Sequence, residues 1–128
     1  MPIEFAIDRE RDFTLFTGSG VLTVEDLLAV FDAYSAAGPT RLELYDFLQV
    51  TQTRLTGEDI RRISMIGVTK SSERIPGSKT VLVAASPDVY GLSRMYQLLG
   101  EVEGVVWDVE VHRTLQDGYA ALGMAAPD

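Results

Sequence analysis

The chain has 128 residues, of which 46% are hydrophobic and 23% charged, and a formal net charge of −8. This length is about that of one domain, so we expect a single domain over residues 1–128. Its apolar runs are far shorter than the ~20 residues of a membrane span, and no secretory signal is visible, which together predict a cytoplasmic protein. The negative charge disfavours nucleic acid as a partner. The absence of cysteine excludes disulfides, thiolate metal sites and a cysteine nucleophile.

The first third of the chain predicts a hairpin followed by a helix. Apolar and polar residues alternate over 3–8 and again over 13–18, with a short charged turn between, which is typical of two antiparallel strands. Residues 23–38 carry apolar side chains at three-and-four spacing, and Gly38-Pro39 ends this predicted helix.

The rest of the chain alternates strands with helices. Strands are expected at 41–47, 80–85 and 105–111, and helices at 56–67, 86–104 and 114–125. The stretch "TVLVAA" is apolar on both faces, which predicts a central buried strand, whereas 105–111 predicts a half-exposed one. Gly118 and Gly123 weaken the last helix.

This order predicts an α/β fold with a mixed sheet of five strands and about four helices. The N-terminal hairpin is followed by βαβ units, so the last four strands should be parallel. The fourth strand should lie inside the sheet and the fifth near an edge.

Three predicted helices open with the same pattern, "TVED", "TGED" and "TLQD", at Thr23, Thr56 and Thr114. A threonine at this position accepts a hydrogen bond from an amide two or three residues on, and the acid favours the positive end of the helix. Thr56 is therefore interpreted first as a helix cap and second as a candidate regulatory switch.

The sequence resembles the SpoIIAA-like branch of the STAS superfamily, whose fold is also compared with SEC14-type lipid carriers. The stretches "MPIEFAID", "GSGVLTVEDLL", "GLSRMYQLL" and "VEVHRTLQDGYAAL" carry the resemblance over nearly the whole chain. Phosphorylatable STAS proteins have a loop similar to Asp-Ser-Ser-Gly before the second helix, where this chain has "RLTG". Only Gly57, and Thr56 by chemistry, fit that loop, while Arg54 and Leu55 depart from it.

Other candidate sites are sparse. Gly18-x-Gly20 between a strand and a helix, with Asp46 near the end of the next strand, is similar to part of a dinucleotide site, but Thr23 stands where the third glycine belongs. His112 is the only histidine, so neither a metal site nor a histidine-based catalytic centre is predicted, and no cofactor is expected. Arg94 is a candidate contact for an anionic group.

The leading functional prediction is a bacterial, non-enzymatic domain that binds another protein or itself. The alternative is a carrier or sensor of a small apolar or lipid-like ligand, and a nucleotide-using enzyme is a distant third. We expect an interior without a ligand-sized cavity, because Leu92, Tyr96, Leu99 and Trp107 are only enough to cover one face of the sheet.

Overall fold

The computed structural model describes residues 3–69, 74–104 and 107–127. Along the chain the elements are β1 (Ile3–Asp8), β2 (Phe13–Leu22), α1 (Val24–Ala37), β3 (Leu42–Thr53), α2 (Gly57–Thr69), β4 (Lys79–Val83), α3 (Pro87–Glu103), β5 (Asp108–His112) and α4 (Leu115–Ala121). The predicted element order and the α/β class are thereby confirmed. No helix in the described ranges is both long and apolar enough to cross a membrane.

The five strands form one sheet in the order β1-β2-β3-β4-β5. β1 is antiparallel to β2, and β2, β3, β4 and β5 are parallel to one another, as the predicted hairpin and βαβ units require. β4 is an interior strand and β5 an edge strand, as expected. The middle strand, however, is β3, because β1 extends the sheet beyond β2.

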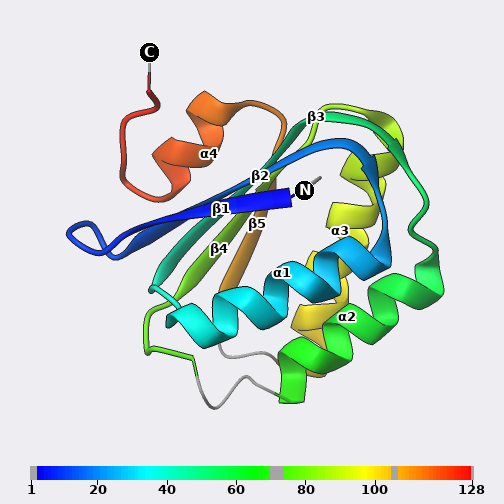
Figure 1. Ribbon diagram of the computed structural model, residues 1–128, viewed down its shortest axis with the longest axis horizontal. Coiled ribbons are helices and arrows are strands. Elements are labelled where there is room, and N and C mark those ends of the chain that lie inside the picture. Colours follow the sequence, from blue (N-terminus) through cyan, green and yellow to red (C-terminus); the bar gives the residue numbers. More distant parts are fainter. Residues whose placement is uncertain (1–2, 70–73, 105–106, 128) are drawn as a thin grey trace.

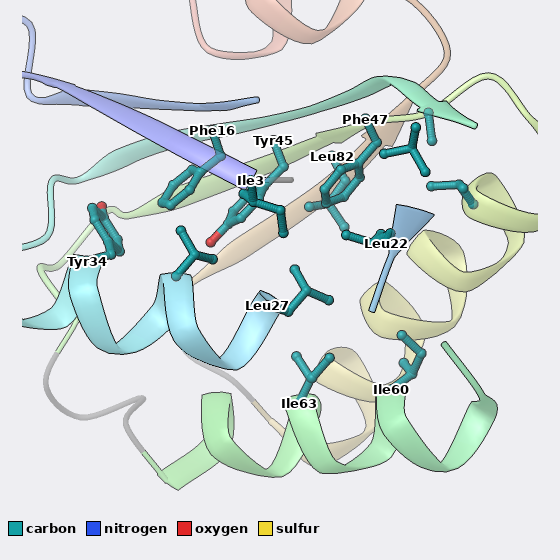
Figure 2. Packing of buried hydrophobic residues seen from close by; sticks show 14 residues of the cluster. Ile3, Phe16, Leu22, Leu27, Tyr34, Tyr45, Phe47, Ile60, Ile63 and Leu82 are labelled. Carbon is teal, nitrogen blue, oxygen red and sulfur yellow. The ribbon is translucent and has the colours of Figure 1, made fainter. Parts of the chain in front are cut away.

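The helices cover the two faces of the sheet unequally. In Figure 1, α1, α2 and α3 lie on one face, and the short α4 lies on the other with the C-terminal residues. The buried side chains accordingly form two clusters. The larger lies under α1, α2 and α3 and includes Phe16, Tyr45 and Leu82, whereas the smaller lies under α4 and includes Leu44 and Tyr119. Figure 2 shows the aromatic and aliphatic side chains of the larger cluster between the sheet and the helices.

β3 is buried on both faces of the sheet. Leu42 and Leu44 face α4, and Tyr45 and Phe47 face the three-helix layer. Glu43 lies between Leu42 and Leu44 in the sequence and is only 2% exposed. The polar position of the strand is therefore inside the protein.

The two glycines considered for a nucleotide site lie inside β2, since that strand continues to Leu22 where the sequence predicted a turn after Gly18. Gly20 has φ +67, and the register between β2 and β3 shifts before Ser19 and again after Gly20, so the strand pairing is irregular here. A Cβ on Gly18 would lie 3.0 Å from the Phe47 side chain. Both glycines serve strand geometry, and the strand-to-helix phosphate turn predicted as the third alternative is absent at this position.

β3 also extends six residues past the predicted end, to Thr53. Residues 49–53 pair only with β2, beyond the end of β4, and their polar side chains are mostly exposed. That exposure explains why hydrophobic alternation missed them. The fifth strand begins at Asp108, so Trp107 precedes it, and the predicted strand residues Val105 and Val106 lie outside the described residues.

Close packing of α4 yields a stability prediction at Gly118. A Cβ at this position would lie 2.7 Å from Val83 Cγ2, well inside van der Waals contact. We expect Gly118→Ala to destabilise the fold by about 1–3 kcal/mol, because overlap outweighs the helix preference for alanine.

Gly91 is the matched control in α3, where a Cβ would meet nothing within 4 Å. Gly91→Ala should stabilise by about 0.5–1 kcal/mol. Urea denaturation of both variants measures whether each substitution raises or lowers the free energy of unfolding. Equal stabilisation by both substitutions would show that α4 does not sit this close to β4.

Candidate functional site

A cavity of about 180 Å³ lies between the sheet and the helices α1, α2 and α3. Its walls are mostly aliphatic and aromatic, and they come from β2, β3, β4 and the three helices. Among the lining residues are Leu22, Leu27, Phe31, Tyr45, Phe47, Ile60, Ile63, Leu82, Val89, Leu92, Tyr96 and Trp107. We expected no ligand-sized cavity, meaning one of ~300 Å³ or more, and the observed volume is smaller, so that expectation is not contradicted.

A helical glycine and a helical serine form part of the cavity wall. Gly67 of α2 and Ser93 of α3 line the cavity, and a Cβ on Gly67 would lie 3.3 Å from the Trp107 ring, so this glycine leaves no free room for a larger side chain. In both figures α2 lies farther from the sheet than α1 does. Leu92, Tyr96 and Trp107, which were expected to cover one face of the sheet, form part of the cavity wall.

One part of the cavity wall is polar and charged, and it is centred on Glu43. The sheet register places Glu43 beside Thr14 of β2 and Thr80 of β4, and all three residues are buried. Thr80 Oγ1 donates a 2.7 Å hydrogen bond to Glu43 Oε1. Arg74 Nη1 donates to the same oxygen at 3.2 Å, forming an ion pair whose side chains are 16% (Arg74) and 3% (Glu43) exposed.

Three polar atoms in this region are buried and have no hydrogen-bond partner among the described residues: Glu43 Oε2, Arg74 Nη2 and Trp107 Nε1. Arg74 also stacks over Trp107, with its guanidinium carbon 4.6 Å from the ring centroid. All three residues line the cavity. Buried polar groups in proteins are almost always paired, so three unpaired atoms on residues of one cavity wall indicate a missing hydrogen-bonding group.

Three tyrosines line the same cavity as Glu43. Burial, and secondly the negative charge of Glu43, raises the pKa of Tyr34, raises that of Tyr45 well above its usual value, and raises the pKa of Tyr96 to about 12. Tyr34, Tyr45 and Tyr96 all line the cavity. Their hydroxyls therefore remain protonated at neutral pH.

Thr56, the candidate switch, begins α2 through a reciprocal capping box. Asp59 N donates to Thr56 Oγ1 at 3.1 Å, and Thr56 N donates to Asp59 Oδ2 at 2.9 Å. Thr23 and Thr114 cap their helices in the same way through the side chain. The structure thus confirms the predicted cap, while a regulatory role of Thr56 stays a prediction.

The structure places Arg94 away from the cavity. It is exposed on α3, and its guanidinium donates to Gln97 Oε1 one turn later. It does not line the cavity with Tyr96. Neither candidate, Thr56 or Arg94, lies among the buried polar residues of the cavity wall. We call these residues the Glu43 cluster: Glu43, Arg74, Thr80 and Trp107. Anion binding by Arg94 stays a prediction.

His112 lies at the end of the edge strand, where its Nε2 is 3.0 Å from Glu110 Oε1. Lys79 also pairs with Glu110, and that contact is the main reason that the pKa of this carboxyl is lowered. Among the described residues, no group of three or more histidine, cysteine or acidic side chains is placed to hold a metal ion.

The Glu43 cluster was missed because each member has an ordinary explanation in the sequence. In the sequence, Glu43 looks like a solvent-facing polar residue of a strand in which polar and apolar residues alternate. Arg74 falls in a polar stretch between elements. The available signal was Thr80 at the start of an otherwise apolar interior strand, since a polar residue there needs a buried partner.

The Thr56 cap gives a second stability prediction. Thr56→Ala should cost about 1 kcal/mol, comparable to Thr23→Ala, because each removes one side-chain acceptor for a helix amide. Thermal or urea denaturation of the two variants checks this. A silent Thr56→Ala, combined with loss of a partner interaction in Thr56→Glu, would favour the switch instead.

Tyr96 makes stability depend on pH in the alkaline range. Below pH 10 both folded and unfolded chains keep the phenol proton, whereas between pH 10 and 12 only the folded chain does, so stability must fall. The fall attributable to one such group is at most about 1.4 kcal/mol per pH unit. Urea midpoints from pH 9 to 11 should decline less steeply in Tyr96→Phe than in the wild type, and parallel curves would contradict the assignment.

No family model matches the chain, and no curated protein matches it. A crystal structure of an uncharacterised protein of the DUF3478 family from Shewanella loihica PV-4, described as having a SpoIIAA-like fold, is similar over 94% of this chain and 93% of that one. The TM-score is 0.57 and the sequence identity 15%, so the likeness concerns the fold. This chain has a SpoIIAA-like α/β fold, as the sequence resemblance implied.

Proposed function

We propose that this protein is a non-enzymatic binding or sensing domain that holds a small, largely apolar molecule in the cavity beneath α1, α2 and α3. The observation that carries this proposal is the cavity itself, with apolar walls and unpaired buried polar atoms on one side. Small-molecule sites commonly have this composition, with hydrophobic walls and a few placed polar groups. The proposal corresponds to the alternative reading of the sequence, with the ligand held inside the fold.

The cavity volume limits the size of the ligand. A volume of 180 Å³ slightly exceeds the ~150 Å³ that suffices for benzene, and it is below the ~300 Å³ at which drug-sized pockets begin. The site therefore suits a molecule of about six to ten non-hydrogen atoms, because the benzene comparison sets the scale. A diacyl lipid of the kind that SEC14-type proteins carry is much too large for it.

Protein binding, expected from the family resemblance, stays a second proposal. The observation that favours it is on α3, where Leu98 and Val102 are one turn apart and are 48% and 84% exposed. Exposed apolar side chains on one helix face are compatible with an interaction surface. The two proposals concern different parts of α3, so ligand binding inside and partner binding outside can coexist.

Toluene is a suitable first probe because it has an apolar body of the right size. We expect toluene to raise the melting temperature of the wild-type protein by mass action. At ten times the dissociation constant the gain is about 1.4 kcal/mol, or roughly 4–6 °C for a domain of this size. Trp107, the only tryptophan, lines the cavity and reports binding directly through its fluorescence or indole NMR signal.

Ser93→Phe provides the blocked variant, since it places a benzyl group into the cavity from α3. Gly91→Phe is the matched control, because position 91 is exposed on the same helix with open space around it. Toluene should stabilise the wild type and the Gly91 variant but not a folded Ser93 variant. Absence of binding to the wild type, or equal binding to all three proteins, would refute the proposed site.

A further inference from the structure

We infer that the ligand of this cavity is a neutral molecule bearing a hydroxyl group, an alcohol or a phenol, whose hydroxyl is held by Glu43 and by Arg74 or Trp107. The inference rests on the proposed function and specifies the chemistry of its ligand. It starts from the three unpaired buried atoms, Glu43 Oε2, Arg74 Nη2 and Trp107 Nε1.

These atoms require both a donor and an acceptor from the ligand. Glu43 Oε2 can only accept a hydrogen bond, because the carboxylate is ion-paired with Arg74 through its other oxygen. Arg74 Nη2 and Trp107 Nε1 can only donate. A pure hydrocarbon would leave all three unpaired, at the cost of their lost hydration. A ketone or ether would pair the donors but leave the carboxylate oxygen without a proton.

The charges of the site exclude an ionised ligand head. Glu43 and Arg74 neutralise each other, and the Glu43 side chain is almost completely buried, while that of Arg74 is 16% exposed. A carboxylate or phosphate would place a second negative charge beside Glu43, and an ammonium group would place a second positive charge beside Arg74. Either would bring one uncompensated charge into an apolar interior, which is strongly unfavourable.

A hydroxyl meets both requirements with one atom. Its proton can be donated to Glu43 Oε2, and its oxygen can accept from Arg74 Nη2 or Trp107 Nε1. Because the acceptor is a carboxylate, this bond is charge-assisted and stronger than one between neutral groups. The apolar remainder of the molecule then lies against the leucine, isoleucine and aromatic side chains of the wall.

A bound water molecule could also pair these atoms, and comparison of toluene with phenol separates the two cases. The two probes have the same number of non-hydrogen atoms and differ by a methyl in place of a hydroxyl. Water hydrates phenol better, so a cavity that offers the hydroxyl no partner should prefer toluene. If a retained water already satisfies the cluster, phenol gains nothing over toluene.

The experiment measures the dissociation constants of phenol and toluene at pH 7 by titration of the Trp107 signal. For the wild type we expect phenol to bind at least tenfold more tightly than toluene. In Glu43→Gln the carboxylate acceptor is lost, so phenol should weaken at least fivefold while toluene changes less than twofold. Toluene has no hydroxyl group, so its unchanged binding to this variant serves as the control that the cavity is intact.

Asp46→Asn is the matched control, since Asp46 is an acid on the same strand that does not line the cavity. It should retain the wild-type preference. Should Glu43→Gln fail to fold, the double variant Glu43→Met/Arg74→Met replaces both charges by apolar groups of similar length and should prefer toluene. Tighter or equal binding of toluene by the wild type overturns the inference while leaving the proposed function standing. Absence of binding by either probe overturns both.

Discussion

A carboxylate buried in the middle strand of the sheet is the constraint on which the architecture of the three-helix side depends. Glu43 is only 2% exposed, and a charge at such a position is tolerated only when it is paired and hydrogen-bonded. Thr80 from the neighbouring strand and Arg74 from the segment before β4 meet that need at one oxygen. Arg74 in turn stacks on Trp107, so one buried charge links three separate parts of the chain.

The helices pack differently on the two faces of the sheet. Under α4 the helix backbone approaches β4 so closely that Gly118 has no room for a methyl group. Under α1, α2 and α3 a cavity that opens partly to solvent remains, and its wall includes the ion pair of Glu43 and Arg74.

Much of the fold could be predicted from the sequence because hydrophobic periodicity reports which faces are buried. The hairpin, the parallel strands, the four helices and the threonine caps all follow from local patterns. The extension of β3 to Thr53 could not be predicted in this way, because that segment pairs on one side only and keeps polar side chains exposed. The irregular pairing around Gly20 likewise interrupts the alternation that identifies a strand.

The candidate site was largely hidden from the sequence for a different reason. Its members lie on β3, on β4, before β4 and before β5. The sheet register brings Glu43 beside Thr80, and only tertiary contacts bring Arg74 and Trp107 to them. Thr56 and Arg94 stood out because their roles depend on near neighbours in the chain, and the structure explains the contacts of both locally. The cavity could not be predicted, because a sequence pattern does not report how much space remains between packed helices and strands.

A high-resolution crystal structure of the wild-type protein soaked with phenol tests the account most directly. The account predicts one phenol molecule between the sheet and the helices α1, α2 and α3, with its oxygen within hydrogen-bonding distance of Glu43 Oε2 and of a nitrogen donor on Arg74 or Trp107. A cavity occupied only by ordered water at the Glu43 cluster, or filled by neighbouring side chains, would contradict it.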